Sequence, residues 1–287
     1  MRLGPRQLSV AAAETTMPKI NLYPVPGWER TEVEPAPPRR GVFTHADLPA
    51  STVLYRYMTL KTAELSLRGG AFWMRPPQSW DDPYERWWCE ELFRPDSRLC
   101  EAKSYGICWT SRNRDEPIWR IYMSPESAMP SIRFRTTAGR LIEWANSEVK
   151  LRDGEAFLGR VRYRAEGLLL NEAEALRAGP AYAQVASAAA RALHLKRLQF
   201  KLEAEIRLLW IETNGRLDDH RDLPLDGLVD QIMIGPTTDA KLRAEAMKRL
   251  LATGCWRFEI DTQVLLALSP EGQTVTHQSL LRQLPAS

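Results

Sequence analysis

The sequence lacks most of the motifs that would point directly to a function. It has four cysteines and four histidines in 287 residues, and the cysteines show no CxxC spacing, so a closed zinc site is not expected. We interpret the cysteines as reduced and buried. No GxGxxG, GxxxxGK[ST], HExxH or GxSxG motif occurs, which excludes classical dehydrogenase, P-loop and serine-hydrolase functions.

The sequence also lacks a strong net charge and a long apolar run. Its 39 Lys and Arg against 36 Asp and Glu leave a formal charge of +3, which neither requires nor excludes a nucleic-acid partner. No apolar run approaches the roughly 18 residues that a membrane span needs, and the N-terminus lacks the basic-then-apolar order of a secretory signal. We expect a cytoplasmic protein without a membrane partner. Delivery by a specialised secretion system stays open, and the oligomeric state is not indicated.

Proline marks the beginning of the chain. Residues 18–38 carry six prolines among polar residues, a composition that buries too little apolar area to offset the entropy of ordering. We therefore expect residues 1–48 to form a flexible tail. A chain that started at Met17 would predict the same domain. Whether residues 1–16 belong to the native product therefore stays open. The tail is expected to precede one domain at 49–265 and a C-terminal extension at 266–287.

Within the domain, strands and helices follow each other in an irregular order. Apolar periodicity and turn residues predict strands at 53–58, 71–75, 105–111, 131–135, 159–163, 200–210, 228–234 and 256–261. They predict helices at 60–68, 118–122, 171–179, 181–199 and 239–253, and another that begins at Pro83 after an Asp82 N-cap. This order favours an α+β domain with a mixed, largely antiparallel and possibly split sheet flanked by helices.

Arg56 is the first candidate for a functional side chain. In the strand at 53–58 it shares a face with Leu54 and Met58. A guanidinium among apolar neighbours needs an anion, since burying an unpaired charge is expensive. One possible anion is a phosphate or carboxylate ligand, because the planar guanidinium can donate two parallel hydrogen bonds to it. The other is an internal Asp or Glu.

Two glutamates are the second candidate. Glu203, Glu205 and Arg207 share one face of the strand predicted at 200–210. The two carboxylates would lie about 6 to 7 Å apart, so that one can position a substrate hydroxyl while the other stabilises developing positive charge. A solvated face of a half-exposed strand shows the same alternation, and that interpretation stays open.

Other candidates lie in two short segments. Residues 79–88, SWDDPYERWW, combine Asp82 and Glu85 with three tryptophans, which form either a core or a stacking wall for an aromatic ligand. Thr110 and Ser111 end the strand at 105–111, where hydroxyl groups can orient a ribose or phosphate or can simply form a turn.

Taken in order, these segments resemble the bacterial family called domain of unknown function 2971. The resemblance covers about residues 53–253 and rests on LYRY (54–57), FWMRP (72–76), WDDPYE (80–85), CWTS (108–111), IWRIY (118–122), VRY (161–163), EAEIR (203–207) and IMIG (232–235).

The order of an arginine, a hydroxyl residue and a glutamate on successive strands is more loosely similar to ADP-ribosyltransferases. This resemblance implies that NAD is the substrate and that a nucleic acid or protein accepts the ADP-ribose, in a toxin or phage-defence effector. Arg56 would bind the pyrophosphate or the adenylate ribose, and Ser111 or Thr110 the nicotinamide ribose. Glu205 would hold the ribose 2′-hydroxyl and stabilise the charge that develops as nicotinamide leaves, and Glu203 would activate the acceptor. The aromatic residues that would contact the nicotinamide are Tyr57, Trp109, Trp119 and Tyr122.

Two other functions remain open at this point. Asp81, Asp82, Glu203 and Glu205 can be combined into a metal-dependent nuclease site, with Arg207 or Lys201 near the scissile phosphate. Alternatively, the tryptophan-rich segment at 79–88 binds a peptide or nucleotide in a sensor module without catalysis.

Overall fold

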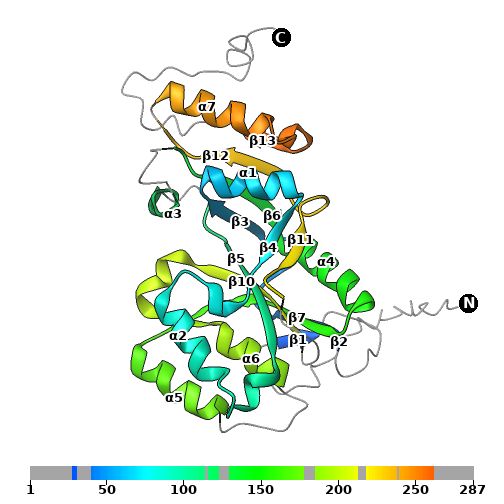
Figure 1. The fold of residues 1–287 in the computed structure, drawn as a ribbon, viewed down its shortest axis with the longest axis vertical. Coiled ribbons are helices and arrows are strands. Elements are labelled where there is room, and N and C mark those ends of the chain that lie inside the picture. Colours follow the sequence, from blue (N-terminus) through cyan, green and yellow to red (C-terminus); the bar gives the residue numbers. More distant parts are fainter. Residues whose placement is uncertain are drawn as a thin grey trace, which may run out of the picture.

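A single mixed sheet organises the part of the chain that the structure describes. The computed structural model describes residues 28–30, 40–113, 116–122, 129–177, 185–212, 218–237 and 239–261. Within these residues the sheet order is β1-β2-β7-β10-β5-β3-β6-β12-β13 (Figure 1). Its strands are β1 (Trp28–Arg30), β2 (Arg40–His45), β3 (Val53–Met58), β5 (Lys103–Thr110), β6 (Ile132–Thr137), β7 (Gly154–Arg160), β10 (Glu205–Glu212), β12 (Gln231–Ile234) and β13 (Glu259–Asp261).

Most neighbours in this sheet are antiparallel. The parallel pairs within this sheet, among the described strands, are β2 with β7 and β12 with β13. Two small sheets accompany it: β4 (Ala71–Met74) pairs with β11 (Arg221–Pro224), and β8 (Arg162–Arg164) pairs with β9 (Leu195–Arg197). The predicted α+β class with a mixed, largely antiparallel sheet is confirmed.

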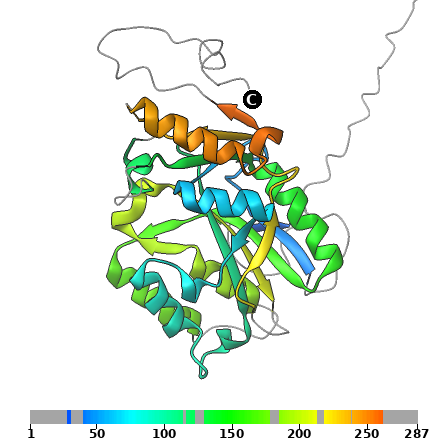
Figure 2. The same cartoon turned by 45° about the horizontal axis from the view of Figure 1, so that its top comes forward.

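The described helices cover both faces of the sheet, and Figure 2 shows α1 and α7 side by side in front of it. They are α1 (Leu60–Gly69), α2 (Pro83–Leu92), α3 (Glu116–Ile121), α4 (Ala138–Leu151), α5 (Glu166–Arg177), α6 (Val185–Leu193) and α7 (Ala240–Leu251). None of the helices in the described ranges combines the length and the apolar character that a membrane span needs.

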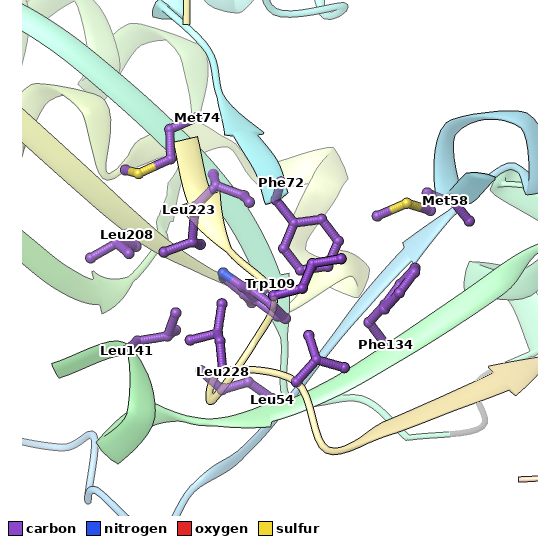
Figure 3. Close-up of a cluster of buried hydrophobic side chains, with 14 of the residues drawn as sticks. Leu54, Met58, Phe72, Met74, Trp109, Phe134, Leu141, Leu208, Leu223 and Leu228 are labelled. Carbon is purple, nitrogen blue, oxygen red and sulfur yellow. The ribbon is translucent and has the colours of Figure 1, made fainter. Parts of the chain in front are cut away.

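One face of the sheet carries the largest apolar cluster. Trp109, Phe72 and Phe134 pack edge to face within it, with ring centroids 5.0 to 5.6 Å apart (Figure 3). Helices α1, α4 and α7 contribute buried side chains to the same cluster. Because side chains alternate along a strand, Ile206 and Leu208 of β10 join this cluster while their neighbours point to the opposite face.

The opposite face carries two separate apolar clusters. One of them packs α2 and α6 against Phe157 and Leu209. A smaller one joins Tyr57 of β3 and Trp119 of α3. Between them lie Thr110 of β5 and its partner Glu205, the first residue of β10.

The sheet is joined by a single residue pair between these clusters. Strands β3 and β5 share one residue pair, Tyr55 with Thr110, whereas β5 pairs with β10 over the full length of both. Beyond that pair β3 and β5 are no longer paired. β3 and β5 thus remain neighbours in one continuous sheet, and we call the place beside Glu205 where they are joined by this single pair the split.

Several local signals behave as the sequence predicts. Helix α1 ends at Gly70, whose φ of 69° is the left-handed conformation that glycine adopts without strain. Helix α2 begins at Pro83, and the Asp82 side chain accepts a hydrogen bond of 2.8 Å from the backbone N–H of Tyr84.

Other predictions about the elements were wrong. The strand expected at 200–210 begins only at Glu205, because residues 198–203 form a 3₁₀ helix, η4 (Leu198–Glu203). The helix expected at 181–199 is interrupted after Leu193, where β9 leaves it to pair with β8. Helix α4 was not predicted.

The expected boundary at residue 49 also falls too late. Strand β2 lies within the segment assigned to the tail, yet it pairs with β7 and buries Val42 and Phe43 completely. Burial of these apolar side chains in the sheet offsets the cost of ordering the segment. Residues 1–27 and the expected extension at 266–287 lie outside the described residues.

Gly154→Ala tests the packing at the end of β7. A Cβ atom there would lie 2.5 Å from Cζ2 of Trp210, a fully buried ring held by a hydrogen bond to Glu212 and by Arg221, whose guanidinium lies 4.0 Å from it. We expect the free energy of unfolding in urea to fall by about 1–3 kcal/mol. Gly167→Ala is the control, because nothing lies within 4 Å of its Cβ position, and an equal loss in both variants would contradict this account.

Candidate active site

A small cavity opens at the split in the sheet. It offers about 30 Å³ of space that a water molecule can enter, and strands β3 and β5, helix α3 and the segment leading into β10 enclose it. Its lining consists of Tyr55, Arg56, Tyr57, Cys108, Trp109, Thr110, Ile118, Ile121, Tyr122, Glu203 and Glu205. The structure thus brings the predicted arginine and both predicted glutamates to one place.

The two glutamates reach the cavity through a bend in the backbone. Glu203 ends η4 and Glu205 begins β10, while Ala204 between them has a φ of 45°. Ala204 is the one described residue other than glycine with a positive φ, a conformation that costs an L-residue roughly 1–3 kcal/mol. The sequence predicted that the two glutamates share one strand face, and this was wrong. They meet because the chain turns between them at Ala204.

The two carboxylates belong to a buried charged cluster, which we define as Glu85, Lys196, Glu203, Glu205 and Arg207. The Lys196 Nζ atom lies 2.6 Å from Glu203 Oε2, 3.2 Å from Glu205 Oε1 and 3.7 Å from Glu85 Oε2. The guanidinium of Arg207 donates to Glu205 Oε2 at 2.7 Å and also to Glu85 Oε1. Three carboxylates and two cations leave one formal negative charge in the cluster.

The pKa values of Glu203 and Glu205 are shifted in opposite directions by their surroundings. Burial alone would raise the pKa of Glu205, but Arg207 and Lys196 outweigh it and lower this pKa to about 2. Burial and the neighbouring Glu205 raise the pKa of Glu203. Glu205 therefore stays ionised across the neutral range, while Glu203 takes up a proton more readily. In catalytic pairs, such a divergence separates an electrostatic group from an acid or base.

Arg56 lies beside the glutamates without a carboxylate of its own. Its Nη1 atom donates to the Cys108 carbonyl at 2.6 Å, and its guanidinium lies 5.7 Å from the centre of the Phe72 ring. The buried Nε atom has no hydrogen-bond partner, and among the described residues no Asp or Glu lies within ion-pair distance of Arg56. The described residues thus offer Arg56 no internal salt bridge.

Some of the hydroxyl and aromatic candidates line the cavity and others lie outside it or in the core. Thr110 lines the cavity, but its hydroxyl already donates to the Glu203 carbonyl at 2.7 Å and accepts from the Arg112 N–H. Ser111 is exposed and lies outside the lining. The Trp109 ring packs into the core against Phe72 (Figure 3).

The remaining aromatic candidates belong to or adjoin α3. Tyr57 and Trp119 are buried against each other, with ring centroids 4.6 Å apart. Tyr122 is 40% exposed and lines the cavity. Of the aromatic candidates, Tyr122 is therefore the one whose ring a ligand can reach.

Asp82 and Glu85 of the 79–88 segment lie outside the cavity lining and contact residues next to it. Glu85 is buried in the charged cluster, and Trp80 lies under the Arg207 guanidinium at 4.6 Å. Asp82 caps α2 and pairs with Arg197 at 3.3 Å. Trp80, Asp82 and Glu85 therefore contribute to packing and to ion pairs, whereas Trp87 of the same segment is 41% exposed.

Two residues at the site escaped the sequence analysis. Lys196 comes from β9, which was predicted as part of a helix, and Tyr163 comes from β8 and accepts a hydrogen bond of 2.8 Å from the Glu205 N–H. The Tyr163 contact joins residues 42 positions apart, whereas Lys196 lies only seven and nine positions before Glu203 and Glu205. A buried lysine can be suspected from acids nearby, but local spacing does not show which acids it meets.

The charges at the site bear on the metal-dependent alternative. Among the described residues, no three His, Cys, Asp or Glu side chains are arranged to hold a metal ion. A divalent cation at Glu203 and Glu205 would also compete with the buried cations Lys196 and Arg207 for the same oxygens. The geometry therefore disfavours a carboxylate-metal nuclease.

Neither the cysteine in the lining nor a larger hollow elsewhere offers a better candidate. Burial raises the pKa of Cys108 to about 12, so its thiol stays protonated at neutral pH and is a poor nucleophile. A polar hollow of about 580 Å³ lies at the other end of β10. Its central cation, Arg221, is already paired with Glu148 and Glu212 at 2.8 and 2.7 Å.

Comparison with known proteins matches the chain to solved structures but to no protein family. No protein-family model and no curated protein matches the chain, so the resemblance to domain of unknown function 2971 is not confirmed. Two solved structures of DarT from Thermus sp. 2.9 match, one in complex with ADP-ribosylated ssDNA and one with NAD+. Each is 13% identical, they cover 75% and 74% of this chain and 96% of their own, and the TM-scores are 0.37 and 0.34. At these scores we infer no activity from the likeness.

Arg207→Met tests the charged cluster. The variant leaves Glu85 and Glu205 buried with one cation fewer, so we expect a loss of about 3–5 kcal/mol in the free energy of unfolding near pH 7. Arg249→Met is the matched control: its partner is Glu64 and the arginine is 37% exposed, so its loss should stay below about 1 kcal/mol.

The loss in Arg207→Met should also depend on pH. In the native protein the pKa of Glu205 lies at about 2, below its ordinary 4.5, so its contribution to stability is complete above about pH 4.5 and disappears toward pH 2. We therefore expect the difference between native protein and variant in urea unfolding to shrink as the pH falls through this window. A difference that does not change with pH would contradict the role of these charges.

Proposed function

We propose that the protein transfers ADP-ribose from NAD to a macromolecular acceptor, a nucleic acid or a protein. The observation that supports this most directly is Arg56, a cavity arginine without a carboxylate partner among the described residues, beside two glutamates of opposite pKa shift. Such an arrangement suits a substrate that is an anion at one end and develops positive charge at the other.

Arg56 would bind the anionic part of the substrate. A guanidinium has five N–H donors in a fixed fork that matches phosphate oxygens. One of them is used by the Cys108 carbonyl, and the Nε donor is buried without a partner. An unsatisfied buried donor costs roughly 1–3 kcal/mol, and a pyrophosphate oxygen of NAD would remove this cost.

Glu205 would act on the nicotinamide ribose. Its two oxygens accept from Lys196 and Arg207, and an ionised carboxylate has about four lone-pair sites. The remaining sites can accept a hydrogen bond from a ribose hydroxyl. As the bond between ribose and nicotinamide breaks, its electron pair leaves with nicotinamide, and the ionised Glu205 stabilises the positive charge on the ribose.

Glu203 would activate the acceptor. Its raised pKa makes it the stronger base of the pair, and the bend at Ala204 brings it to the same cavity as Glu205. The acceptor atom forms the new bond to the ribose carbon while its proton passes to Glu203. Transfer of this kind to a macromolecule suits a toxin or a phage-defence effector.

The cavity has to open before NAD can bind. Its roughly 30 Å³ is well below the 300–1,000 Å³ of ordinary ligand pockets. Ile118 and Ile121 of α3, with Tyr122, cover one side, and Ile121 is 62% exposed. Outward movement of this short helix would enlarge the cavity and leave the Tyr122 ring free to stack on nicotinamide.

Transfer from labelled NAD, with and without a chelator, tests the proposal. Purified protein is incubated with single- and double-stranded nucleic acids and with protein acceptors. We expect label on one acceptor class regardless of chelation, and a fall in kcat of about 10²- to 10³-fold in Glu205→Gln. Glu212→Gln makes the same change at the other end of β10, outside the cavity, and should retain activity.

The other outcomes identify the alternatives. Nucleic-acid cleavage that requires a divalent cation would replace the proposal with the nuclease. Saturable binding of NAD or a peptide without label transfer or release of nicotinamide would replace it with the sensor module. Equal activity in Glu205→Gln and the native protein would remove Glu205 from the mechanism.

Arg56→Lys tests the anion contact separately. Lysine keeps the charge but loses the fork, so we expect the Kd for NAD in calorimetry to rise about tenfold to a hundredfold, the equivalent of one charged hydrogen bond. Competition by ADP-ribose, which retains the pyrophosphate, should weaken in parallel. An unchanged Kd for both ligands would show that Arg56 does not bind the phosphates.

A further inference from the structure

Lys196 lies behind the two glutamates and not in the cavity itself. It is absent from the lining, and its side chain is 7% exposed. Its ammonium nevertheless contacts Glu203 and Glu205 together, at 2.6 and 3.2 Å. A lysine so buried is rare unless it is paired, and here it is shared between the two carboxylates that face the cavity.

A dedicated piece of backbone holds Lys196 in this position. Strand β9 pairs in parallel with β8, so that Lys196 lies opposite Tyr163. The Tyr163 hydroxyl accepts from the Glu205 N–H at 2.8 Å, while the Phe200 ring lies 4.7 Å from the Lys196 ammonium. The two-stranded sheet therefore holds Glu205 twice. Tyr163 of β8 binds its backbone N–H, and Lys196 of β9 binds its carboxylate.

Resting on the proposed function, we infer that Lys196 is a positioning residue. It keeps the Glu205 carboxylate ionised and directed toward the cavity, and it separates the tasks of Glu205 and Glu203. It touches neither the substrate nor the reacting atoms. Its influence passes through the two glutamates that it bridges.

Electrostatics explains why one lysine can separate the tasks. The groups around its ammonium are Glu85 of α2, Glu203 of η4, and Glu205 and Arg207 of β10, and it also acts on Tyr163 of β8. Without Lys196, three carboxylates would face one cation, and Glu203 and Glu205 would repel each other at close range. Two carboxylates in that state share one proton, so Glu205 would lose its constant negative charge.

The groups on the far side of Glu205 cannot replace Lys196. Arg56 of β3 acts on Glu205 through space but forms no ion pair with it. Cys108 of β5 and Tyr122 after α3 are neutral in their ordinary forms, and burial raises the pKa of the Cys108 thiol further. Arg207 is already divided between Glu85 and Glu205.

The test compares Lys196→Met, Lys196→Arg and Lys196→Gln in NAD turnover between pH 4 and 9. We expect Lys196→Met to lower kcat about 10- to 100-fold, as loss of a supporting contact does, with KM for NAD nearly unchanged. The acid limb of kcat, which Glu203 as the base sets, should move to higher pH by about one unit, because Lys196 lowers the pKa of Glu203 and its loss lets Glu203 take up a proton more readily. Lys196→Arg should restore most of both values.

Lys61→Met is the matched control, because Lys61 is an exposed lysine of α1 outside the cavity lining. It should leave kcat and the acid limb unchanged. If Lys196→Met fails to fold, Lys196→Gln carries the same comparison. A variant that folds and loses thermal stability while keeping its kcat and its acid limb would overturn the inference, since that result describes a purely structural lysine.

A titration without NAD separates this inference from the proposed function. Carboxylate signals of ¹³C-labelled protein, assigned with Glu203→Gln and Glu205→Gln, are followed between pH 2 and 8. We expect Glu205 to titrate at higher pH in Lys196→Met than in the native protein. That shift without any NAD turnover would end the proposed function but leave the control of Glu205 by Lys196 intact, whereas unshifted titration would end the inference itself.

Discussion

The pairing of Arg207 with Glu85 and Glu205 is the interaction on which the arrangement of the site depends. Arg207 is almost completely buried, and it joins the central strand β10 to helix α2, while its Nη1 atom also donates to the Leu193 carbonyl at the end of α6. A charge this deep requires partners, so the positions of α2, α6 and the beginning of β10 are not independent of one another. Lys196 of β9 adds a second cation to the same carboxylates. Four parts of the chain are thereby tied together at one end of the cavity.

This constraint explains why a polar site can exist in the middle of a sheet. On the face that carries Glu205, one apolar cluster packs under α2 and α6 and another under α3. The charged cluster occupies the interval between them, where β3 and β5 separate. The cost of burying its charges is offset within the cluster by short ion pairs, and the apolar clusters on both sides keep water from most of its members.

The sequence revealed the local features of this arrangement better than the long-range ones. The Asp82 cap, the helix stop at Gly70 and the alternation of β3 follow from residue types within a few positions. The bend at Ala204 was not predictable, because alanine normally avoids positive φ and only tertiary packing holds it there. Helix α4 was overlooked although Ala138, Leu141, Ala145 and Val149 recur on one face. Glu203, Glu205 and Arg56 were found from their types, but their meeting depends on the split in the sheet, which strand patterns do not encode.

The bond from Arg56 to the Cys108 carbonyl has a consequence for the continuity of the sheet. Where β3 and β5 separate, backbone carbonyls lose the strand partner that would otherwise donate to them, and a buried carbonyl without a donor is costly. The guanidinium supplies that donor from a side chain at 2.6 Å. The Arg56 side chain thus replaces a backbone hydrogen bond that β3 and β5 do not form at this position. A protein that keeps this residue for its sheet also keeps a guanidinium in the lining of the cavity, so that selection for folding alone would preserve a cation there.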